Sequence, residues 1–359
     1  MLQWGWNMDE RQLEGQKSKE DLIREAEDAI GRNDPDDYRI QLTVFPKKLA
    51  SSAPELSAVL GHSSLTETAK RYEEQNAKAL TIQELFKRLS KRGTWAVFVA
   101  TTAAALLASL AAISPKDPGL LFRSVFVLLG LCSFAGGSLT AFMLYRVNSE
   151  HLLWSWMSSR AVAESERIGY FNRLVRRVTE KDAKHPRLLL LCLEFIRRYQ
   201  LAVQQNYYRD RGASHRDSRR RTVITGAVAA AILALGAGGF GIWASVHPIV
   251  LPLSALGTIG AALTIVASRR EELNQDERNA ERYQRTYETL SSIRELHSDV
   301  QQVVASGNSE VLVQYVAAIH EQLSLEHRQW LAETEAMDST IKELNSSLEA
   351  LIRGGNRKS

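Results

Sequence analysis

Three groups of residues in this chain have types and spacings that also occur in chemical sites. The basic run from Arg216 to Arg221 could contact the phosphates of a nucleic acid. The glycine-rich stretch from Gly236 to Gly241 has the composition of a nucleotide-binding loop. A third group contains two histidines and two glutamates and could ligate a metal ion: His320, Glu321, Glu326 and His327.

The surrounding sequence gives each group a plainer interpretation. The glycine stretch lies inside an apolar block, without a preceding strand or a lysine, so helix packing explains it. His320 and His327 are seven residues apart, whereas helical metal sites use three or four, which favours a solvated or helix-pairing role. The basic run adjoins an apolar block and more simply binds anionic lipid headgroups. We therefore predict no catalytic residue, no metal site, no cofactor and no nucleic-acid partner.

Four apolar blocks predict transmembrane helices at residues 95–113, 124–145, 222–245 and 249–268. Each approaches or exceeds the roughly 20 residues that a helix needs to cross a bilayer. A helix in a soluble core would keep a polar face, and these blocks have none. Short links containing Pro115 and Pro248 pair the blocks into two antiparallel hairpins. The predicted fold is all-α: two tandem transmembrane hairpins continued by cytoplasmic helical stalks.

Basic residues on one side of these blocks predict the orientation. They flank the inner ends of all four blocks, whereas the outer links contain only Lys116, with Arg123 at an edge where it snorkels to headgroups. We expect a multi-pass protein of the inner (plasma) membrane, with both termini and residues 146–221 in the cytoplasm. The residues expected to contact headgroups and set this topology are Arg219, Arg220, Arg221, Arg269 and Arg270.

Two correspondences predict an internal repeat. Arg71-Tyr72 and Arg198-Tyr199 precede the first and third blocks by nearly the same distance. Small residues also recur every fourth position on one face of each of these two blocks, in a shared register, and such faces allow close helix packing in lipid. We call these two sets the small-residue ladders: Ala100, Ala104, Ala108 and Ala112, and Gly226, Ala230, Ala234 and Gly238.

The repeat divides the chain into four predicted parts. Residues 1–60 form an N-terminal cytoplasmic segment, 61–182 the first unit, 183–335 the second unit, and 336–359 the end of the last helix and a tail. Within the N-terminal segment we expect a helix over 21–30 that stops at Gly31. Tyr38, Ile40, Leu42 and Val44 alternate like a strand. This strand would either add to another protein's sheet or, as we favour, pack as an extended segment.

The cytoplasmic parts of both units carry further helix signals. Ser64 and Glu67 fit a capping box at the start of a helix that runs on into the first block, and Pro186 suits the first position of another. After the fourth block, three-and-four spacing marks one buried stripe, expected to pack on the helix that enters the third block, followed by a break at Gly307. The stripe comprises Tyr283, Tyr287, Leu290, Ile293, Leu296, Val300 and Val303.

Residues 313–330 resemble the C-terminal signature of SLATT domains, which are two-transmembrane modules. The resemblance rests on the Glu-His-x-x-Trp ending, and the residues that carry this family motif are Glu321, Glu326, His327 and Trp330. It covers residues 186–332, and the first unit, about 64–180, resembles a more divergent copy that lacks the motif. SLATT domains are associated with bacterial conflict systems that use nucleotide second messengers. The resemblance implies a membrane effector and brings no catalytic residue.

Two functions are compatible with these observations, and a third is less so. The first is an anti-phage effector that oligomerises and forms a pore, or otherwise disrupts the membrane, when a partner or a nucleotide signal triggers it. The second is a non-enzymatic membrane anchor that recruits a cytoplasmic sensor. A transporter is less favoured because no block contains a well-buried charge or a broken helix. The expected partners are membrane lipid, further copies of the chain, and a cytoplasmic sensor or nucleotide-signalling protein.

Overall fold

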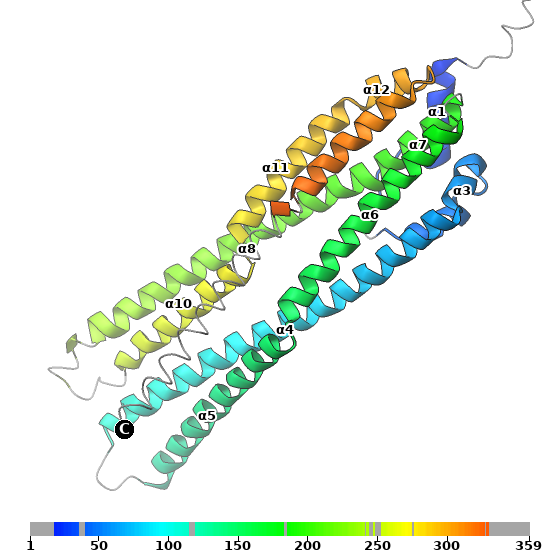
Figure 1. Ribbon diagram of the computed structural model, residues 1–359. Helices are drawn as coiled ribbons and strands as arrows, with labels where there is room; N and C mark the ends of the chain where they lie inside the picture. The colour runs from blue at the N-terminus through cyan, green and yellow to red at the C-terminus, as the bar shows by residue number, and fades with distance from the viewer. Residues whose placement is uncertain are drawn as a thin grey trace, which may run out of the picture. The chain divides into compact units, whose positions relative to one another are not determined.

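The computed structural model describes residues 18–35, 40–114, 119–182, 185–240, 242–243, 247, 253–274, 276–326 and 328–329, and over these residues it contains helices and turns but no strand (Figure 1). The α-helices are α1 (Lys19–Ile30), α2 (Phe45–Lys48), α3 (Pro54–Leu60), α4 (Ser63–Ala112), α5 (Leu120–Ser149), α6 (Leu152–Asp182), α7 (Pro186–Ile196), α8 (Val203–Leu233), α10 (Ala255–Asn274), α11 (Asp276–Glu295) and α12 (His297–Val304). Leu42–Val44 is a 3-10 helix (η2), and Arg197–Ala202 (η3) and Ala234–Phe240 (η4) are π-helices. A further helix covers 309–326. The predicted all-α class is confirmed for the described residues.

The chain forms two compact units, which are described separately. The first contains Met1–Glu74, Ala161–Tyr208 and Arg285–Ser359, and we call it the polar unit because most of the buried polar and charged side chains lie in it. The second contains Gln75–Arg160 and Arg209–Gln284, and we call it the hairpin unit. Each unit takes residues from both predicted repeats, because the long helices α4, α6 and α8 pass from one unit into the other. The predicted boundaries at residues 60, 182 and 335 stay predictions.

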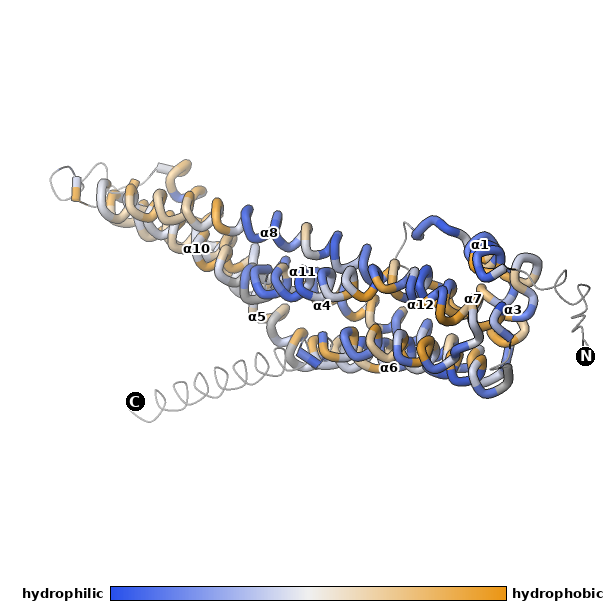
Figure 2. Tube along the Cα trace, turned by 90° about the horizontal axis from the view of Figure 1, so that it is seen from above, coloured by the Kyte–Doolittle hydropathy of each residue, from blue (hydrophilic) through white to orange (hydrophobic). Residues whose placement is uncertain are grey.

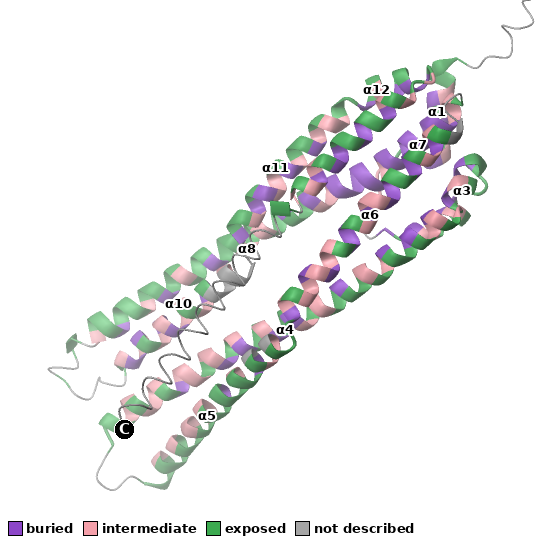
Figure 3. Cartoon of the chain, in the orientation of Figure 1, coloured by how far each residue is buried: buried purple, intermediate pink, exposed green. Residues whose placement is uncertain are grey.

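Helix α7 is the centre of the polar unit, and every residue from Leu188 to Ile196 is buried. Figure 3 shows α7 largely in purple, the colour of buried residues. Helices α1, α3 and α12 pack against it. An aromatic cluster connects α7 with α2 and η3. The ring centroid of Phe195 in α7 lies 5.0 Å from that of Phe45 in α2 and 5.1 Å from that of Tyr199 in η3.

The N-terminal helix confirms the predicted end at Gly31, but it begins at Lys19, two residues before the predicted start. The Ser18 side chain accepts a hydrogen bond from the Asp21 backbone N–H, and the helix ends at Gly31, whose φ of +102° favours glycine. The strand prediction is wrong, because residues 42–44 are a 3-10 turn that leads into α2. Leu42 and Phe45, three residues apart as on a helix face, are buried, while Val44 is exposed. Tyr38 lies outside the described residues.

Two local predictions on the long helices need correction. Helix α4 begins at Ser63, and the His62 ring Nδ1 accepts from the Ser64 backbone N–H at 3.3 Å, so Ser64 is not the cap. In the stripe after the fourth block, Leu290 is buried as expected, but Leu296 and Val303 are exposed. The chain turns at Leu296, between α11 and α12, and this break moves the buried line of α12 to His297, Gln301 and Val304.

The partner predicted for this stripe is nevertheless confirmed. In the polar unit, Gln205 of α8 donates to the Ser291 hydroxyl of α11 at 3.2 Å and accepts from Arg294 at 3.0 Å. In the hairpin unit, the His215 ring lies 2.6 Å from Asp276 Oδ1, and Arg219 forms an ion pair with Glu277 at 2.6 Å. Helix α11 therefore runs along the helix that enters the third apolar block.

Glycines set the closest helix contacts inside the hairpin unit. A Cβ added to Gly136 of α5 would lie 2.9 Å from the Ala96 carbonyl oxygen of α4. The contact of the second hairpin is closer, since a Cβ on Gly236 would lie 1.9 Å from the backbone nitrogen of Gly257 in α10. Only glycine permits that approach without moving a backbone. The closest contacts inside the two hairpins are therefore made at Gly136 and Gly236, which are not ladder positions.

The apolar blocks form helices whose side chains are mostly unburied. Three helical stretches, beginning at Ser63, Leu120 and Pro186, are long and apolar enough to cross a membrane. The fourth block is shorter in the structure, where its apolar helix covers Ala255–Ser268, and the predicted residues 249–252 lie outside the described part. In Figure 2, the tube of α8 changes from blue, for hydrophilic residues, to orange along its length. Figure 3 shows α5 mostly in green, the colour of exposed residues.

Replacing Gly236 by alanine tests the second hairpin contact. We expect Gly236→Ala to destabilise the fold by about 1–3 kcal/mol, because the new methyl group must displace the α10 backbone. The matched control is Gly239→Ala, where a Cβ meets no atom within 4 Å. Thermal unfolding in detergent measures both, and equal melting temperatures for the two variants would contradict the contact.

Candidate functional site

The polar unit contains a buried charge network centred on Glu194. The carboxylate of this α7 residue has no exposed surface. Its Oε2 accepts from Arg197 Nε at 2.6 Å, and its Oε1 lies 2.7 Å from both His297 Nε2 and Gln301 Nε2. Helix α7 supplies the acid, η3 the guanidinium group, and α12 the other two partners.

The partners of Glu194 keep its carboxylate charged. Burial alone would raise the pKa of Glu194, but the hydrogen bond and charge of His297, together with Arg197, outweigh it and lower the pKa. This pKa shift stabilises the fold above the pKa of an unfolded glutamate, and the contribution is lost as the pH falls through the lowered native value. At neutral pH the network therefore holds α7 and α12 together.

The same network reaches the N-terminal segment through charged and polar groups. Gln301 donates a second hydrogen bond, to Glu27 of α1 at 3.0 Å. Asp34 forms ion pairs with Arg197 at 3.2 Å and Arg294 at 2.8 Å. Arg197 also donates to the carbonyl oxygens of Gly31 and Arg32 at 3.3 and 3.4 Å. The end of α1 is thus bound by guanidinium groups that match the partial negative charge of a helix C-terminus.

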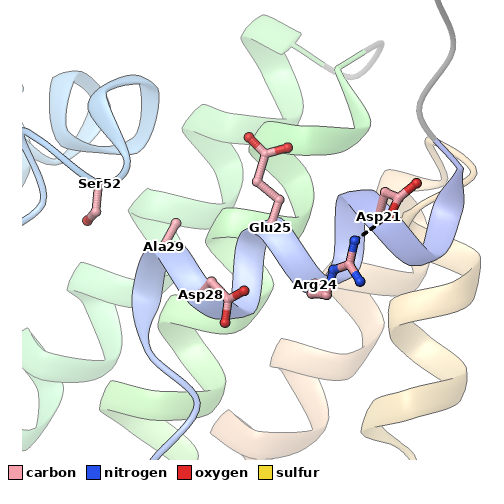
Figure 4. Close-up of a pocket in the computed structure, with 6 residues that line it drawn as sticks. All are labelled: Asp21, Arg24, Glu25, Asp28, Ala29 and Ser52. Carbon is pink, nitrogen blue, oxygen red and sulfur yellow. Dashed lines mark hydrogen bonds and ion pairs between the residues drawn. The ribbon is translucent and has the colours of Figure 1, made fainter.

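A shallow, acidic surface hollow lies beside α1 (Figure 4). Its volume is about 560 Å³, and its lining includes the carboxylates of Asp21, Glu25 and Asp28, with Ser52 from the loop before α3. Arg24 lies within it but is paired with Asp21 at 2.7 Å. Glu25 also pairs with Arg187 of α7 at 2.9 Å. The hollow shares no residue with the network around Glu194, so the two features are separate.

Of the two described residues of the family motif, the structure brings Glu326 into contact with α8. Glu326 accepts a hydrogen bond from the Tyr208 hydroxyl at 3.0 Å, whereas Glu321 is exposed. His327 and Trp330 lie outside the described part of the chain. His320, one of the histidines considered for a metal, instead lies 2.7 Å from Asn172 Oδ1. Among the described residues, no group of three or more His, Cys, Asp or Glu side chains is placed to hold a metal ion.

One ladder residue, Ala100, takes part in the close contact inside the first hairpin, because a Cβ on Gly136 would lie 3.0 Å from the Ala100 Cβ. Ala104, Ala108 and Ala112 are exposed in the first ladder, and Ala230, Ala234 and Gly238 are exposed in the second. Among the described residues, a Cβ on Gly226 or Gly238 would meet nothing within 4 Å. Most of the ladder surface is thus free of contacts with the described part of the chain.

The predicted headgroup residues lie at the ends of the apolar segments. Arg219, Arg220 and Arg221 are exposed on α8. Arg219 forms an ion pair with Glu277 at 2.6 Å. Arg269 and Arg270 are helical residues of α10, and their side chains lie outside the described part.

Sequence reasoning missed the network around Glu194, although two signals were present. Glu194 is the one charged residue within the apolar run Leu188–Ile196, and a charge in such a run needs a buried partner. Leu290, His297 and Val304 follow a seven-residue spacing that predicts one helix face. The prediction instead placed the apolar residues Val300 and Val303 on the buried face of α12. Comparison with known proteins adds no guide here, since no family model, no curated protein and no solved structure matches this chain.

Removing the central acid tests the network. We expect Glu194→Ala to destabilise the protein by roughly 3–5 kcal/mol, because Arg197 and His297 would be left buried without their partner. Glu321→Ala removes an exposed acid as a control and should change stability by less than about 0.5 kcal/mol. Urea unfolding of the full chain in detergent gives both values. A small loss for Glu194→Ala would show that the network does not hold the bundle.

His320 gives the polar unit a pH dependence. Burial, with the nearby charge of Arg167, lowers the pKa of His320 to about 4, whereas an unfolded histidine titrates near 6.5. Between these values the unfolded chain binds the extra proton, so stability falls as the pH is lowered from about 6.5 to about 4, by up to roughly 3 kcal/mol. His320→Gln should flatten this slope, and His247→Gln, at an exposed position, should not. Unfolding measured across this range checks both.

Proposed function

We propose that this chain is a multi-pass effector of the bacterial inner membrane, with four transmembrane helices in two hairpins and its polar helices in the cytoplasm. On a signal from a partner or a nucleotide, copies of the chain assemble and open or disrupt the membrane. No step of this action requires catalysis by the chain itself.

The observation that carries the membrane location is apolar surface that the chain does not bury. In each of the three long apolar stretches, few of the residues in the most apolar 18-residue segment are buried: 11%, 6% and 11%. Leu120, Leu121 and Phe134 of α5 are 85%, 82% and 75% exposed. A protein in water rarely leaves such large contiguous apolar surface uncovered, whereas lipid tails cover it without penalty. The buried core lies instead in the polar unit, around α7.

The fourth span is supported by its pairing with the third. Helix α10 packs against η4, so the two apolar segments are neighbours as a hairpin requires. The 14 apolar residues of Ala255–Ser268 measure about 21 Å at 1.5 Å per residue, too short for a hydrocarbon core of about 30 Å. The predicted span 249–268 has 20 residues and reaches that length. Basic residues at the inner ends of the blocks then favour cytoplasmic termini.

Assembly of several copies is supported by the free ladder faces. Small residues allow helix backbones to approach closely, which is the main source of helix association in lipid. Because the contacts inside each hairpin use Gly136 and Gly236, the ladder surfaces remain for another copy of the chain. The resemblance of residues 313–330 to the SLATT signature supports the effector role, and the Glu326–Tyr208 bond ties that signature to α8, whose helix continues into the third block.

A non-enzymatic anchor that recruits a cytoplasmic sensor is the second candidate. It would recruit the sensor through residues 1–60 and the helical stalks, but α1 and α3 pack against α7, and Arg187 pairs with both Glu25 and Glu55. The described part of this segment therefore belongs to the polar unit's own structure. The acidic hollow beside α1 is the surface on which a basic partner would act if the anchor hypothesis holds.

Substitution of the ladder glycines tests the proposal. We expect Gly226→Ile with Gly238→Ile to reduce crosslinked oligomers and dye release from vesicles of bacterial lipid at least about tenfold, while the fold is retained because both sites are open. The matched control is Gly137→Ile with Gly239→Ile, two equally open positions outside the ladders. Unchanged oligomers in the ladder variant would exclude the ladders as the interface. Crosslinked oligomers that release no dye, with or without a nucleotide trigger, would favour the anchor.

A further inference from the structure

Residues 19–35, which we call the strap, pack on α7 and are bound mainly through polar groups of η3, α8, α11 and α12. Only Ile23, Ala26 and Ile30 of α1 are buried. The charged and polar contacts are more numerous. Gln301 donates a hydrogen bond to Glu27, and Arg197 and Arg294 form ion pairs with Asp34. Arg198 donates to the Ile30 carbonyl, and Asn206 donates to the Pro35 carbonyl at 3.1 Å. Contacts of this kind require defined geometry and are lost when a donor moves by a few ångströms.

Two of the arginines that bind the strap belong to the π-helix η3. Arg197 and Arg198 begin this segment, which connects α7 to α8. A π-helix uses i→i+5 hydrogen bonds and contains an extra residue relative to an α-helix, and such turns are rare and often found at functional sites. The position of these guanidinium groups therefore depends on the π register. Gly31 is part of the fit, since a Cβ there would overlap the Arg198 side chain.

The π register also has an internal cost. Gln200, in the middle of η3, is 1% exposed, and neither atom of its side-chain amide has a hydrogen-bond partner among the described residues. A buried polar group without a partner destabilises the conformation that contains it. An alternative register would move Gln200 to another face of the helix. Strap contacts that exist only in the π register offset this cost.

We propose that the strap and η3 form a latch. The bound strap holds residues 197–202 in the π-helical conformation, and release of the strap lets these residues become α-helical. The residue stored in η3 then shifts the helix register by one. A shift of one residue corresponds to a turn of about 100° and a rise of about 1.5 Å. Because α8 is continuous from Val203 to Leu233, its downstream residues turn with it.

Amide hydrogen exchange on the full-length protein in detergent tests the latch. Glu27→Ala with Asp34→Ala removes the two strap carboxylates that contact Gln301, Arg197 and Arg294, and it should raise the exchange rates of both the strap and residues 197–203 by on the order of 10-fold. The matched control is Glu20→Ala with Asp28→Ala, which removes two exposed carboxylates from the same helix. It should leave both rates unchanged.

A second variant changes η3, the other half of the latch, and must slow amide exchange in the strap instead of raising it. Gln200→Met keeps the side-chain length and removes the unpartnered amide, so it stabilises the π register. Coupling is reciprocal, so exchange of the strap should slow by on the order of 10-fold although Gln200 lies outside it. If strap release leaves residues 197–203 unchanged, or if Gln200→Met leaves the strap unchanged, the latch is overturned.

Exchange at residues 170–178 separates the latch from unfolding of the polar unit. Tyr170, Phe171 and Leu174 of α6 are buried in that unit, and a local latch leaves them protected. If the strap variant also exposes 170–178, the polar unit has unfolded, and the Gln200→Met result alone decides. None of these measurements involves leakage, so a failed latch and a failed membrane effector are distinguishable.

Discussion

The constraint on which the rest of this structure depends is that the chain builds its buried core around one apolar helix, α7, and leaves the side chains of its long apolar stretches mostly uncovered. The segment from Pro186 to Phe240 shows both halves of the constraint. Around Leu188–Ile196 every side chain is buried, including the charged Glu194, whereas Val223, Ile224 and Leu235 are exposed. The proposed membrane location accounts for this difference, because lipid would cover apolar side chains that a protein in water rarely leaves exposed.

In the polar unit, burial of one carboxylate determines how several helices meet. Glu194 can remain charged inside the core because Arg197, His297 and Gln301 are all directed at it, from η3 and α12. Those partners in turn bind the strap through Glu27 and Asp34. A network of this kind specifies one arrangement of helices, since any slip leaves a buried charge unpaired. The hairpin unit uses the opposite principle, with glycines that let backbones touch.

The sequence was sufficient to predict the helices, because charge-free runs and helix-stop residues are local signals. Gly31, Pro186 and Gly307 all mark helix ends where they were expected. It was insufficient where a tertiary contact overrides a local pattern. The alternation around Leu42 predicts a strand, but the segment docks on α7 as a turn and a short helix. The turn at Leu296 moved the buried line of α12 by one residue, from Val300 and Val303 to Gln301 and Val304, so the pattern missed the residues that bind Glu194. The ladder positions were visible as a pattern, yet Gly236, which makes the closest contact, lay outside it.

The membrane arrangement is tested most directly by cysteine labelling in intact bacterial cells. The background is Cys132→Ser, because burial raises the pKa of the Cys192 thiol and leaves it inert. With a membrane-impermeant maleimide, Gly119→Cys and His247→Cys in the two short links should be labelled from outside, and Glu180→Cys and Gln302→Cys only after permeabilisation. Labelling of Glu180→Cys or Gln302→Cys in intact cells, or protection of both links, would contradict the account.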